Sequence, residues 1–139
     1  MAYPVRFIPS EEGGYTVVVS GVDGAISEGA TRKKAEQAVI DVIADMANYY
    51  LDEKKQIPPA PLQREGEEIV RIPIVMALKI VLRNEMLALG ISQRELAKRL
   101  GISSQLLNQT LDLARTRTSI DSLDACFQAI GKKLSIAIN

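Results

Sequence analysis

The chain has 139 residues, of which 47% are hydrophobic and 4% aromatic, enough for one ordinary domain or two small ones. It contains one cysteine and no histidine. A single cysteine excludes an internal disulfide and a multi-thiolate zinc site, and the lack of histidine removes the commonest general base and metal ligand. We therefore expect a protein that is not an enzyme and needs no metal or cofactor.

The net charge is zero, but the charges are unevenly distributed along the chain. Residues 1–72 contain 8 Lys/Arg and 12 Asp/Glu, whereas residues 73–139 contain 9 and 5. This division fits a basic half that binds a polyanion and an acidic half that binds something cationic, with chance fluctuation as the alternative. No apolar run has the length of a membrane span and the N-terminus lacks a signal-peptide pattern, so we expect a cytoplasmic protein without membrane contact.

The first third of the chain has the composition of a small sheet. Residues 3–9 and 15–20 are rich in strand-forming residues, and the turn at 12–14 between them predicts a hairpin. A second turn at 21–24 leads into a third predicted strand at 25–28. Tyr15, Val17 and Val19 are expected on one face of the sheet because side chains alternate along a strand.

An amphipathic helix is predicted from Thr31, a good N-cap residue, to about Asp52. Its apolar positions recur at three- and four-residue steps: Ala35, Ala38, Val39, Val42, Ile43, Met46 and Tyr50. The opposite face carries an acidic stripe, Asp41, Asp45 and Asp52, accompanied by Gln37 and Asn48. This stripe is either an ordinary solvated face or a binding surface.

The prolines in the middle of the chain determine where helix is excluded and where the next helix begins. Residues 57–62 contain three prolines, cannot be helical and mark the edge of the first domain. A strand is predicted at 67–72, and Pro73 precedes a helix from Ile74 to Leu89 that Gly90 closes as a left-handed cap. Helical segments continue to about residue 131, and the alternating residues 134–138 predict a terminal strand. We thus predict an α+β chain with domains 1–62 and 74–139, joined by the linker and strand 63–73.

Residues 91–111 have the layout of a helix-turn-helix that reads the DNA major groove. Ser92 and Glu95 have the spacing of a capping box, and Gly101 ends the first helix. Ser103 or Ser104 begins a second helix, which Leu107 and Leu111 would anchor to the core. The alternative is a helical hairpin packed for structural reasons only.

The residues left outside on the second helix are uncharged and polar. Amide side chains bond an adenine edge with two hydrogen bonds, and hydroxyls bond several bases. The candidate base contacts are Ser104, Gln105, Asn108 and Gln109. The candidate phosphate contacts are Gln93, Arg94, Lys98, Ser103, Arg115 and Arg117.

Three stretches together resemble the HicB antitoxins, the partners of the small HicA toxins. The N-terminal stretch comprises Tyr3-Pro-Val, Glu12-Gly-Gly-Tyr15 and the helix from Thr31. The linker stretch is Ile57-Pro-Pro-Ala-Pro-Leu62. The C-terminal stretch comprises residues 93–101, Ile120-Asp121 and Gly131-Lys-Lys-Leu134. The resemblance implies a partial ribonuclease-H-like first domain and a phage-repressor-like helix-turn-helix. It also implies that the chain neutralises a HicA-type toxin that cleaves mRNA and represses its own operon at operator DNA.

One turn departs from the family pattern. A Pro-Asp-Leu-Pro-Gly-like turn usually follows the second strand, whereas this chain has Ser20-Gly-Val-Asp-Gly24, without proline. A ribonuclease H enzyme needs several carboxylates that converge on metal ions, and Asp23 and Glu28 do not supply such a set, so we predict an inactive first domain. Asp23 and the acidic stripe are instead predicted to contact the toxin, as a mimic of RNA phosphates.

Two other functions are compatible with the sequence. A stand-alone transcription regulator would sense a small ligand and predicts an apolar pocket with a few polar groups within residues 1–60. A metal-dependent nuclease is the other.

Helix-turn-helix units act in pairs, so we expect a homodimer or larger homo-oligomer. Residues 134–138 and the helix around 122–130 are the candidates for its surface, unless they pack within one chain, and Cys126 is expected to be buried.

Overall fold

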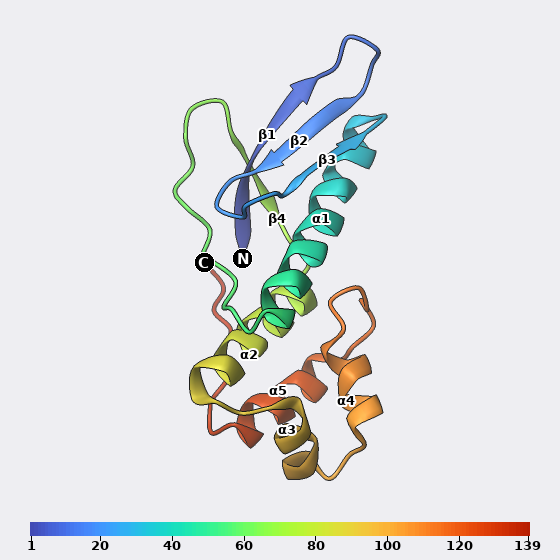
Figure 1. Ribbon diagram of the computed structural model, residues 1–139. Helices are drawn as coiled ribbons and strands as arrows, with labels where there is room; N and C mark the ends of the chain where they lie inside the picture. Colours follow the sequence, from blue (N-terminus) through green and yellow to red (C-terminus); the bar gives the residue numbers. More distant parts are fainter. The chain divides into compact units, whose positions relative to one another are not determined.

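The computed structural model describes all 139 residues, which divide into two compact units, Met1–Ile74 and Val75–Asn139. The elements of the first unit are β1 (Ala2–Pro9), β2 (Tyr15–Val19), β3 (Ile26–Gly29), α1 (Arg32–Asp52) and β4 (Glu68–Arg71). Four helices follow: α2 (Ile74–Leu89), α3 (Gln93–Leu100), α4 (Ser104–Leu111) and α5 (Ile120–Ala129). The chain is therefore α+β, as predicted (Figure 1). None of its helices is both long enough and apolar enough to cross a membrane.

The sheet of the first unit is antiparallel, in the order β3-β2-β1-β4, and α1 lies along one of its faces (Figure 1). Val5 pairs with Val19 and Phe7 pairs with Val17, so these side chains share the face on which Tyr15 also lies. The predicted hairpin, third strand and shared face are confirmed. The strand predicted at 67–72 is β4, which pairs with β1 and so completes the sheet.

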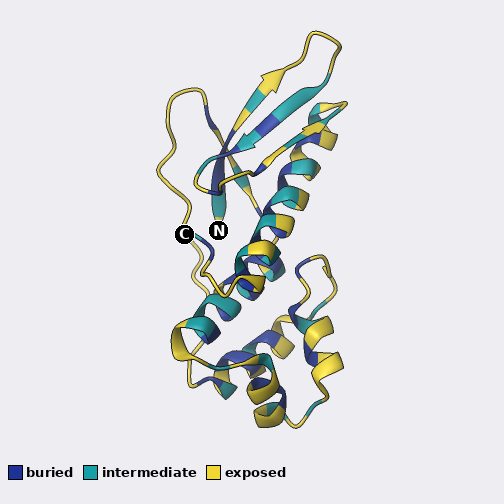
Figure 2. Cartoon of the chain, in the orientation of Figure 1, coloured by how far each residue is buried: buried dark blue, intermediate teal, exposed yellow.

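The helix α1 begins where its sequence predicts. The Thr31 hydroxyl accepts a hydrogen bond from the Lys34 N–H at 3.1 Å, which satisfies one of the free donors of the first turn. Ala44 is one of the six buried residues of α1, and the other five follow a four-residue step: Ala35, Val39, Ile43, Ala47 and Leu51. The other predicted apolar positions flank this row and are half-buried, so the outer side of α1 is left to solvent (Figure 2).

The turn that departs from the family pattern contacts the proline-rich segment. Gly21 has a φ of +83°, and a Cβ atom there would lie 2.4 Å from Pro61 Cδ. Only glycine satisfies both the left-handed backbone and this close approach. The turn itself contains no proline, but Pro61 of the proline-rich segment packs against it.

Glu67 fixes the end of the same segment. Its carboxylate accepts hydrogen bonds from the Ser20 hydroxyl and from the Arg64 N–H at 2.8 Å, with Arg64 Nε at 3.3 Å. The Ser20 hydroxyl bond, helped by Arg64 against the opposing effect of burial, lowers the pKa of Glu67 to about 2. Glu67 is therefore ionised and ties residues 64–67 to the end of β2.

The second unit has a core of its own, contributed by all four helices. Its buried members include Leu82 and Met86 of α2, Leu96 of α3, and Leu107 of α4. From α5, Leu123, Cys126 and Phe127 join them. Burial raises the pKa of the Cys126 thiol, so Cys126 behaves as the predicted small hydrophobe. The apolar side of α5 is thus occupied within its own unit.

The predicted terminal strand at 134–138 is wrong for the single chain. These residues form neither helix nor strand, and Ile136 and Ile138 are 58% and 99% exposed. The alternating pattern is real, but a strand exists only when another strand accepts its hydrogen bonds, and the second unit contains none.

Candidate functional site

The turn between α3 and α4 is built by local capping. Ser92 accepts from the Glu95 N–H at 3.1 Å, and Gly101 ends α3 with φ 68° and ψ 29°. The Glu95 carboxylate accepts from Arg99 Nε at 3.2 Å, so only the serine half of the predicted capping box is present. Arg99 also donates to the Ala129 carbonyl at 3.0 Å and thereby attaches α3 to α5.

Leucines anchor α4 and leave its polar side outside. Ser103 is the N-cap and accepts from the Leu106 N–H at 3.0 Å, which decides between the two predicted caps. Leu107 and Leu111 are 0% and 1% exposed. The four candidate base contacts are all exposed: Ser104, Gln105, Asn108 and Gln109. A short helix with an anchored apolar side therefore presents amide and hydroxyl groups to solvent.

A first hollow joins α3 to the start of α4. It has a volume of about 630 Å³, and its lining includes Arg94, Lys98, Ser103 and Ser104. Four of the predicted DNA contacts, from both helices, therefore come together. Gln93 is half-buried and lies outside this lining.

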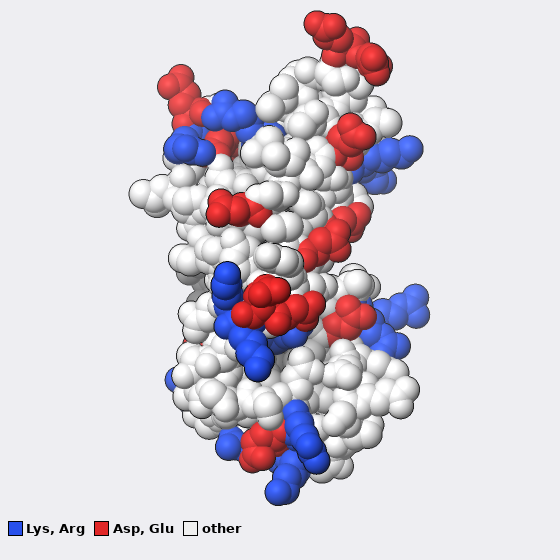
Figure 3. All heavy atoms as spheres, viewed as in Figure 1, with Lys and Arg blue, Asp and Glu red and all other residues white.

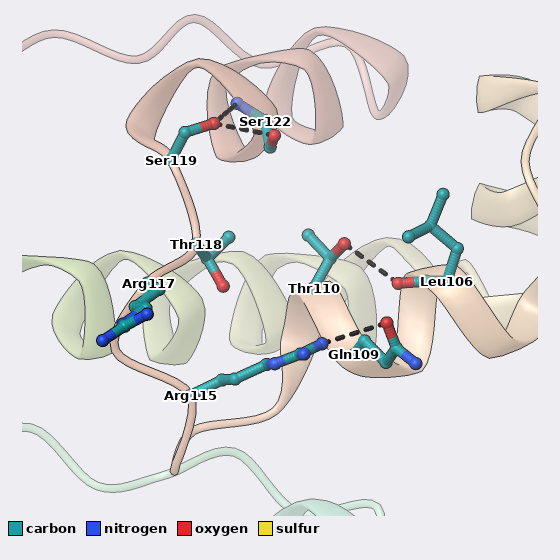
Figure 4. A pocket seen from close by; sticks show the side chains of 8 residues that line it. All are labelled: Leu106, Gln109, Thr110, Arg115, Arg117, Thr118, Ser119 and Ser122. Atoms are coloured by element: carbon teal, nitrogen blue, oxygen red, sulfur yellow. Dashed lines mark hydrogen bonds between the residues drawn. The ribbon is translucent and has the colours of Figure 1, made fainter.

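A second hollow, of about 330 Å³, lies beside the end of α4 and the loop that follows it (Figure 4). It brings together Gln109, Arg115 and Arg117 with Ser119, the N-cap of α5. Arg115 Nη1 donates to Gln109 Oε1 at 3.0 Å, so a predicted phosphate contact holds a predicted base contact. Figure 4 shows Arg115 extended along α4 towards Gln109.

The predicted acidic stripe lies on the outer side of α1. Asp41, Asp45 and Asp52 are exposed, and Gln37 Nε2 donates to Asp41 at 3.0 Å. Asp23 is also exposed, in the turn between β2 and β3. A Cβ atom at the adjacent Gly24 would lie 3.5 Å from Met46 Cε, so this turn packs beside the middle of α1. Figure 3 shows red carboxylates along the part of the surface that α1 crosses, and blue Lys and Arg over α3 and beside the loop after α4.

Comparison with known proteins identifies the family. A model described as the HicB_like antitoxin of bacterial toxin-antitoxin systems matches residues 2–81, more than half of the chain. The chain belongs to the HicB-like antitoxin family. It is 34% identical over 139 residues to Antitoxin HicB 1 of Photorhabdus laumondii subsp. laumondii, covering 99% of this chain and 87% of the relative. It is 32% identical over 139 residues to Antitoxin HicB of Escherichia coli K12, covering 99% of both chains.

The first unit of this HicB-like antitoxin contains one hollow that bears on the ligand-sensing alternative. It has a volume of about 480 Å³ and lies between the β1–β2 turn and the start of α1. Glu12, Glu28 and Lys34 contribute to its lining, with Tyr15 as the aromatic side chain. Its charged walls differ from the apolar pocket that a small-molecule sensor predicts. The chain also contains no group of three or more Cys, Asp and Glu side chains placed to hold a metal ion.

Two residues near the candidate DNA-binding face of this HicB-like antitoxin were not identified as functional candidates from the sequence. Leu106 is 48% exposed on the otherwise polar side of α4 and also lines the second hollow. An exposed leucine next to the buried Leu107 was a readable signal, because consecutive helix positions point about 100° apart. An apolar side chain there suits the methyl group of thymine.

Lys79 of α2 is the second missed residue. It is 0% exposed, and its Nζ donates to the carbonyls of Asp112 and Arg115, both at 2.7 Å. Burial lowers the pKa of Lys79, the charge of Asp112 opposes this shift and that of Arg115 adds to it. Its position three residues after the buried Met76 placed it on the inner side of the helix, but nothing in the sequence identified its partners.

Proposed function

We propose that this HicB-like antitoxin neutralises a HicA-type, mRNA-cleaving toxin through its first unit and represses its own operon at operator DNA through its second. The outer side of α4 carries the DNA-binding part of the proposal. Its four exposed polar side chains sit on a helix whose apolar side is buried, between two hollows that contain Arg94, Lys98, Arg115 and Arg117.

In this proposal α3 and α4 form a helix-turn-helix related to that of phage repressors. The helix α4 enters the major groove, where Gln105 and Asn108 bond base edges and Leu106 contacts a thymine methyl. Lys98 and Arg94 bind the phosphates on one side of α4, and Arg115 and Arg117 those on the other. Base contacts determine sequence preference, whereas phosphate contacts determine register and salt dependence.

A titration of labelled duplexes tests the DNA-binding part. One duplex carries the promoter region of the protein's own operon, and the other has the same length and composition in scrambled order. At moderate ionic strength we expect the promoter duplex to bind more tightly, because only it offers matched base edges. Equal binding of both duplexes would overturn operator recognition and leave at most a toxin-blocking role.

The toxin-binding part rests on the acidic side of α1. In the proposal, the first unit is a partial ribonuclease-H-like domain without nuclease activity, and its carboxylates face a basic toxin surface that otherwise grips RNA. Asp41, Asp45 and Asp52 replaced together by Asn should slow association with a co-expressed HicA-type toxin and flatten its salt dependence. Glu11, Glu12 and Glu65, replaced together by Gln, form the control with the same change in charge. Equal association rates for the wild type and both variants would refute the role of the stripe.

We also propose a homodimer, because one α4 reads too few bases for useful specificity. Two copies would place their α4 helices ~34 Å apart on a palindromic site. The alternating residues 134–138 lack a partner strand within the chain, and apart from Leu134, which packs against the core, they are exposed. They are suited to pair with the same segment of a second copy.

Sedimentation tests the dimer. Ile136 and Ile138 replaced together by Asp should shift the protein towards the monomer and reduce operator affinity. Leu62→Asp is the control, since Leu62 is 90% exposed but lies in the first unit. A dimer that withstands the double substitution would exclude this segment as the contact.

A further inference from the structure

We propose that Lys79 is a positioning residue for DNA binding, which holds the turn after α4 so that Arg115 is presented beside Gln109. The inference rests on the proposed operator binding and adds to it a residue that contacts no DNA.

The two carbonyls that Lys79 binds lie at the two ends of one turn. Asp112 is the C-cap of α4, and the Arg115 N–H donates to the Asp112 carbonyl at 3.1 Å. The Asp112 side chain accepts from the Ala114 N–H at 3.0 Å. One ammonium group, 33 and 36 residues away in sequence, therefore bonds both ends of this turn and attaches it to α2.

An ammonium group is well suited to this position. The ends of helices and turns leave carbonyl oxygens without partners, and burying such an oxygen unpaired costs free energy. A lysine carries several N–H donors at the end of a flexible stem, so one side chain can satisfy two carbonyls that point to one place. An apolar residue of the same length would bury no charge, but it would leave the Arg115 oxygen without this donor and the Asp112 oxygen with only the Arg115 N–H.

The burial of Lys79 separates a positioning role from a direct one. Its side chain is 0% exposed, so its charge cannot reach a DNA phosphate in this conformation. A change in DNA binding on its replacement therefore acts through the groups it holds or through the stability of the unit, and not through a direct contact. The Arg115 carbonyl is one of those groups, and the Arg115 guanidinium is the part of the same residue that reaches Gln109 in the second hollow (Figure 4).

The turn therefore connects the buried ammonium group of Lys79 to the exposed guanidinium group of Arg115. With both carbonyls bonded, the backbone of Arg115 has a defined position, and its side chain starts from a fixed point towards α4. Less conformational freedom is then lost when Arg115 binds a phosphate. Without Lys79, the turn loses this attachment to α2 and the advantage is reduced, while α4 itself keeps its anchors Leu107 and Leu111.

Lys79→Met, in the full-length protein without DNA, tests the first step. Amide hydrogen exchange across residues 113–117 should become at least tenfold faster, whereas the amides of α4 and α5 should change much less. Lys133→Met is the matched control, because it removes the same charge from an exposed residue of the same unit. Unchanged exchange across 113–117 in Lys79→Met would overturn the proposed hold on the turn.

A double-mutant cycle in DNA affinity tests the second step. Lys79→Met should weaken binding to the promoter duplex about tenfold and lower the salt slope by about one ion, as the loss of one phosphate contact does. In an Arg115→Ala background, the same substitution should cost less than about twofold, since the contact it positions is already gone. Equal losses in both backgrounds would overturn the role of Lys79, because a general loss of stability affects both alike.

The outcomes separate this inference from the function on which it rests. If wild-type protein fails to distinguish promoter from scrambled duplex, operator recognition fails and the role of Lys79 in it fails too. If the wild type discriminates and the cycle is additive, only the positioning role is lost. Should Lys79→Met not fold, the same cycle is run with Lys79→Gln, whose amide keeps N–H donors, and additivity there is equally decisive.

Discussion

The two units of this HicB-like antitoxin each bury one charged side chain, and the two charges have opposite signs. Glu67 in the first unit binds hydroxyl, backbone N–H and guanidinium donors, while Lys79 in the second binds two backbone carbonyls. In both cases the buried charge holds an irregular segment that no helix or strand secures. An irregular loop can thus be fixed by a single ion whose bonding groups match the polar groups of the loop.

The partners of the two ions differ in a way that matters for experiment. Ser20 and Arg64 bind Glu67 partly through side chains, so that network can be disturbed from either end. Lys79 binds main-chain oxygens, which no substitution removes. The first unit can therefore be probed by exchanging partners, whereas the second must be probed through Lys79 itself or through the residue that it positions.

The largest expected effect tests whether each unit folds around its own core. Leu107→Ala removes a side chain that is 0% exposed and should cost about 2–5 kcal/mol of the second unit's stability, as cavity-creating substitutions do. Denaturant unfolding should show this loss together with loss of DNA binding, while toxin binding by the first unit persists. Leu106→Ala, at the exposed neighbour, should stay within about 0.5 kcal/mol of wild type. Loss of toxin binding in Leu107→Ala would contradict the independence of the two units.

The first unit has its own matched pair, Gly21 and Gly13. Both have left-handed backbones, with φ of +83° and +90°, but only Gly21 faces Pro61, and nothing lies within 4 Å of a Cβ atom at Gly13. Alanine at either position should cost about 1–2 kcal/mol for the backbone strain. Gly21→Ala should cost roughly 1–3 kcal/mol more, because its Cβ overlaps the proline ring. Equal unfolding free energies for the two variants would show that the Pro61 contact yields without cost.

Within the second unit, base and phosphate contacts should separate. Gln105→Ala is expected to cost ~1–3 kcal/mol on the promoter duplex and little on scrambled DNA, because it removes an adenine-edge contact. Lys98→Ala should weaken both duplexes alike and lower the salt slope by about one ion. Titrations at several salt concentrations measure both quantities. Identical behaviour of the two variants would refute this division of roles.

The smallest effect concerns Glu67 and the acid stability of the first unit. Its pKa is lowered from 4.5 to about 2 in the folded chain. The stabilising contribution is therefore complete above pH 4.5 and disappears as the pH falls towards 2. Unfolding of the first unit should thus depend less on pH in this range for Glu67→Gln than for wild type. Glu65→Gln, at an exposed neighbour, is the control and should keep the wild-type dependence.

Local signals predicted most of the elements. The N-caps Thr31 and Ser92, the closing residues Gly90 and Gly101, and the three- and four-residue steps of the apolar positions placed the helices to within a residue or two. The candidate base contacts emerged from the same reasoning, because a helix with two buried leucines leaves its other side to solvent. These features depend on neighbours in sequence, which a single chain reveals directly.

Which partner a given group takes was not predictable in this way. The Glu95 carboxylate binds Arg99 instead of the backbone N–H of Ser92 that the predicted capping box requires, because both groups lie within one helical turn of Glu95. Residues 134–138 alternate like a strand, yet the chain supplies no partner for them. The hydrogen bond between Ser20 and Glu67 joins residues 47 positions apart, and no sequence pattern in either segment predicts it.

The sequence by itself determined where this antitoxin forms its helices and the four strands of its sheet, which sides of them are apolar, and which family it resembles. The tertiary structure decided which polar groups meet: Glu67 with Ser20 and Arg64, Lys79 with the turn after α4, and Arg115 with Gln109. The physical reason lies in the range of the interactions. Capping and amphipathicity act over a few residues, whereas a buried charge finds its partners only when the folded chain brings distant backbone groups to it.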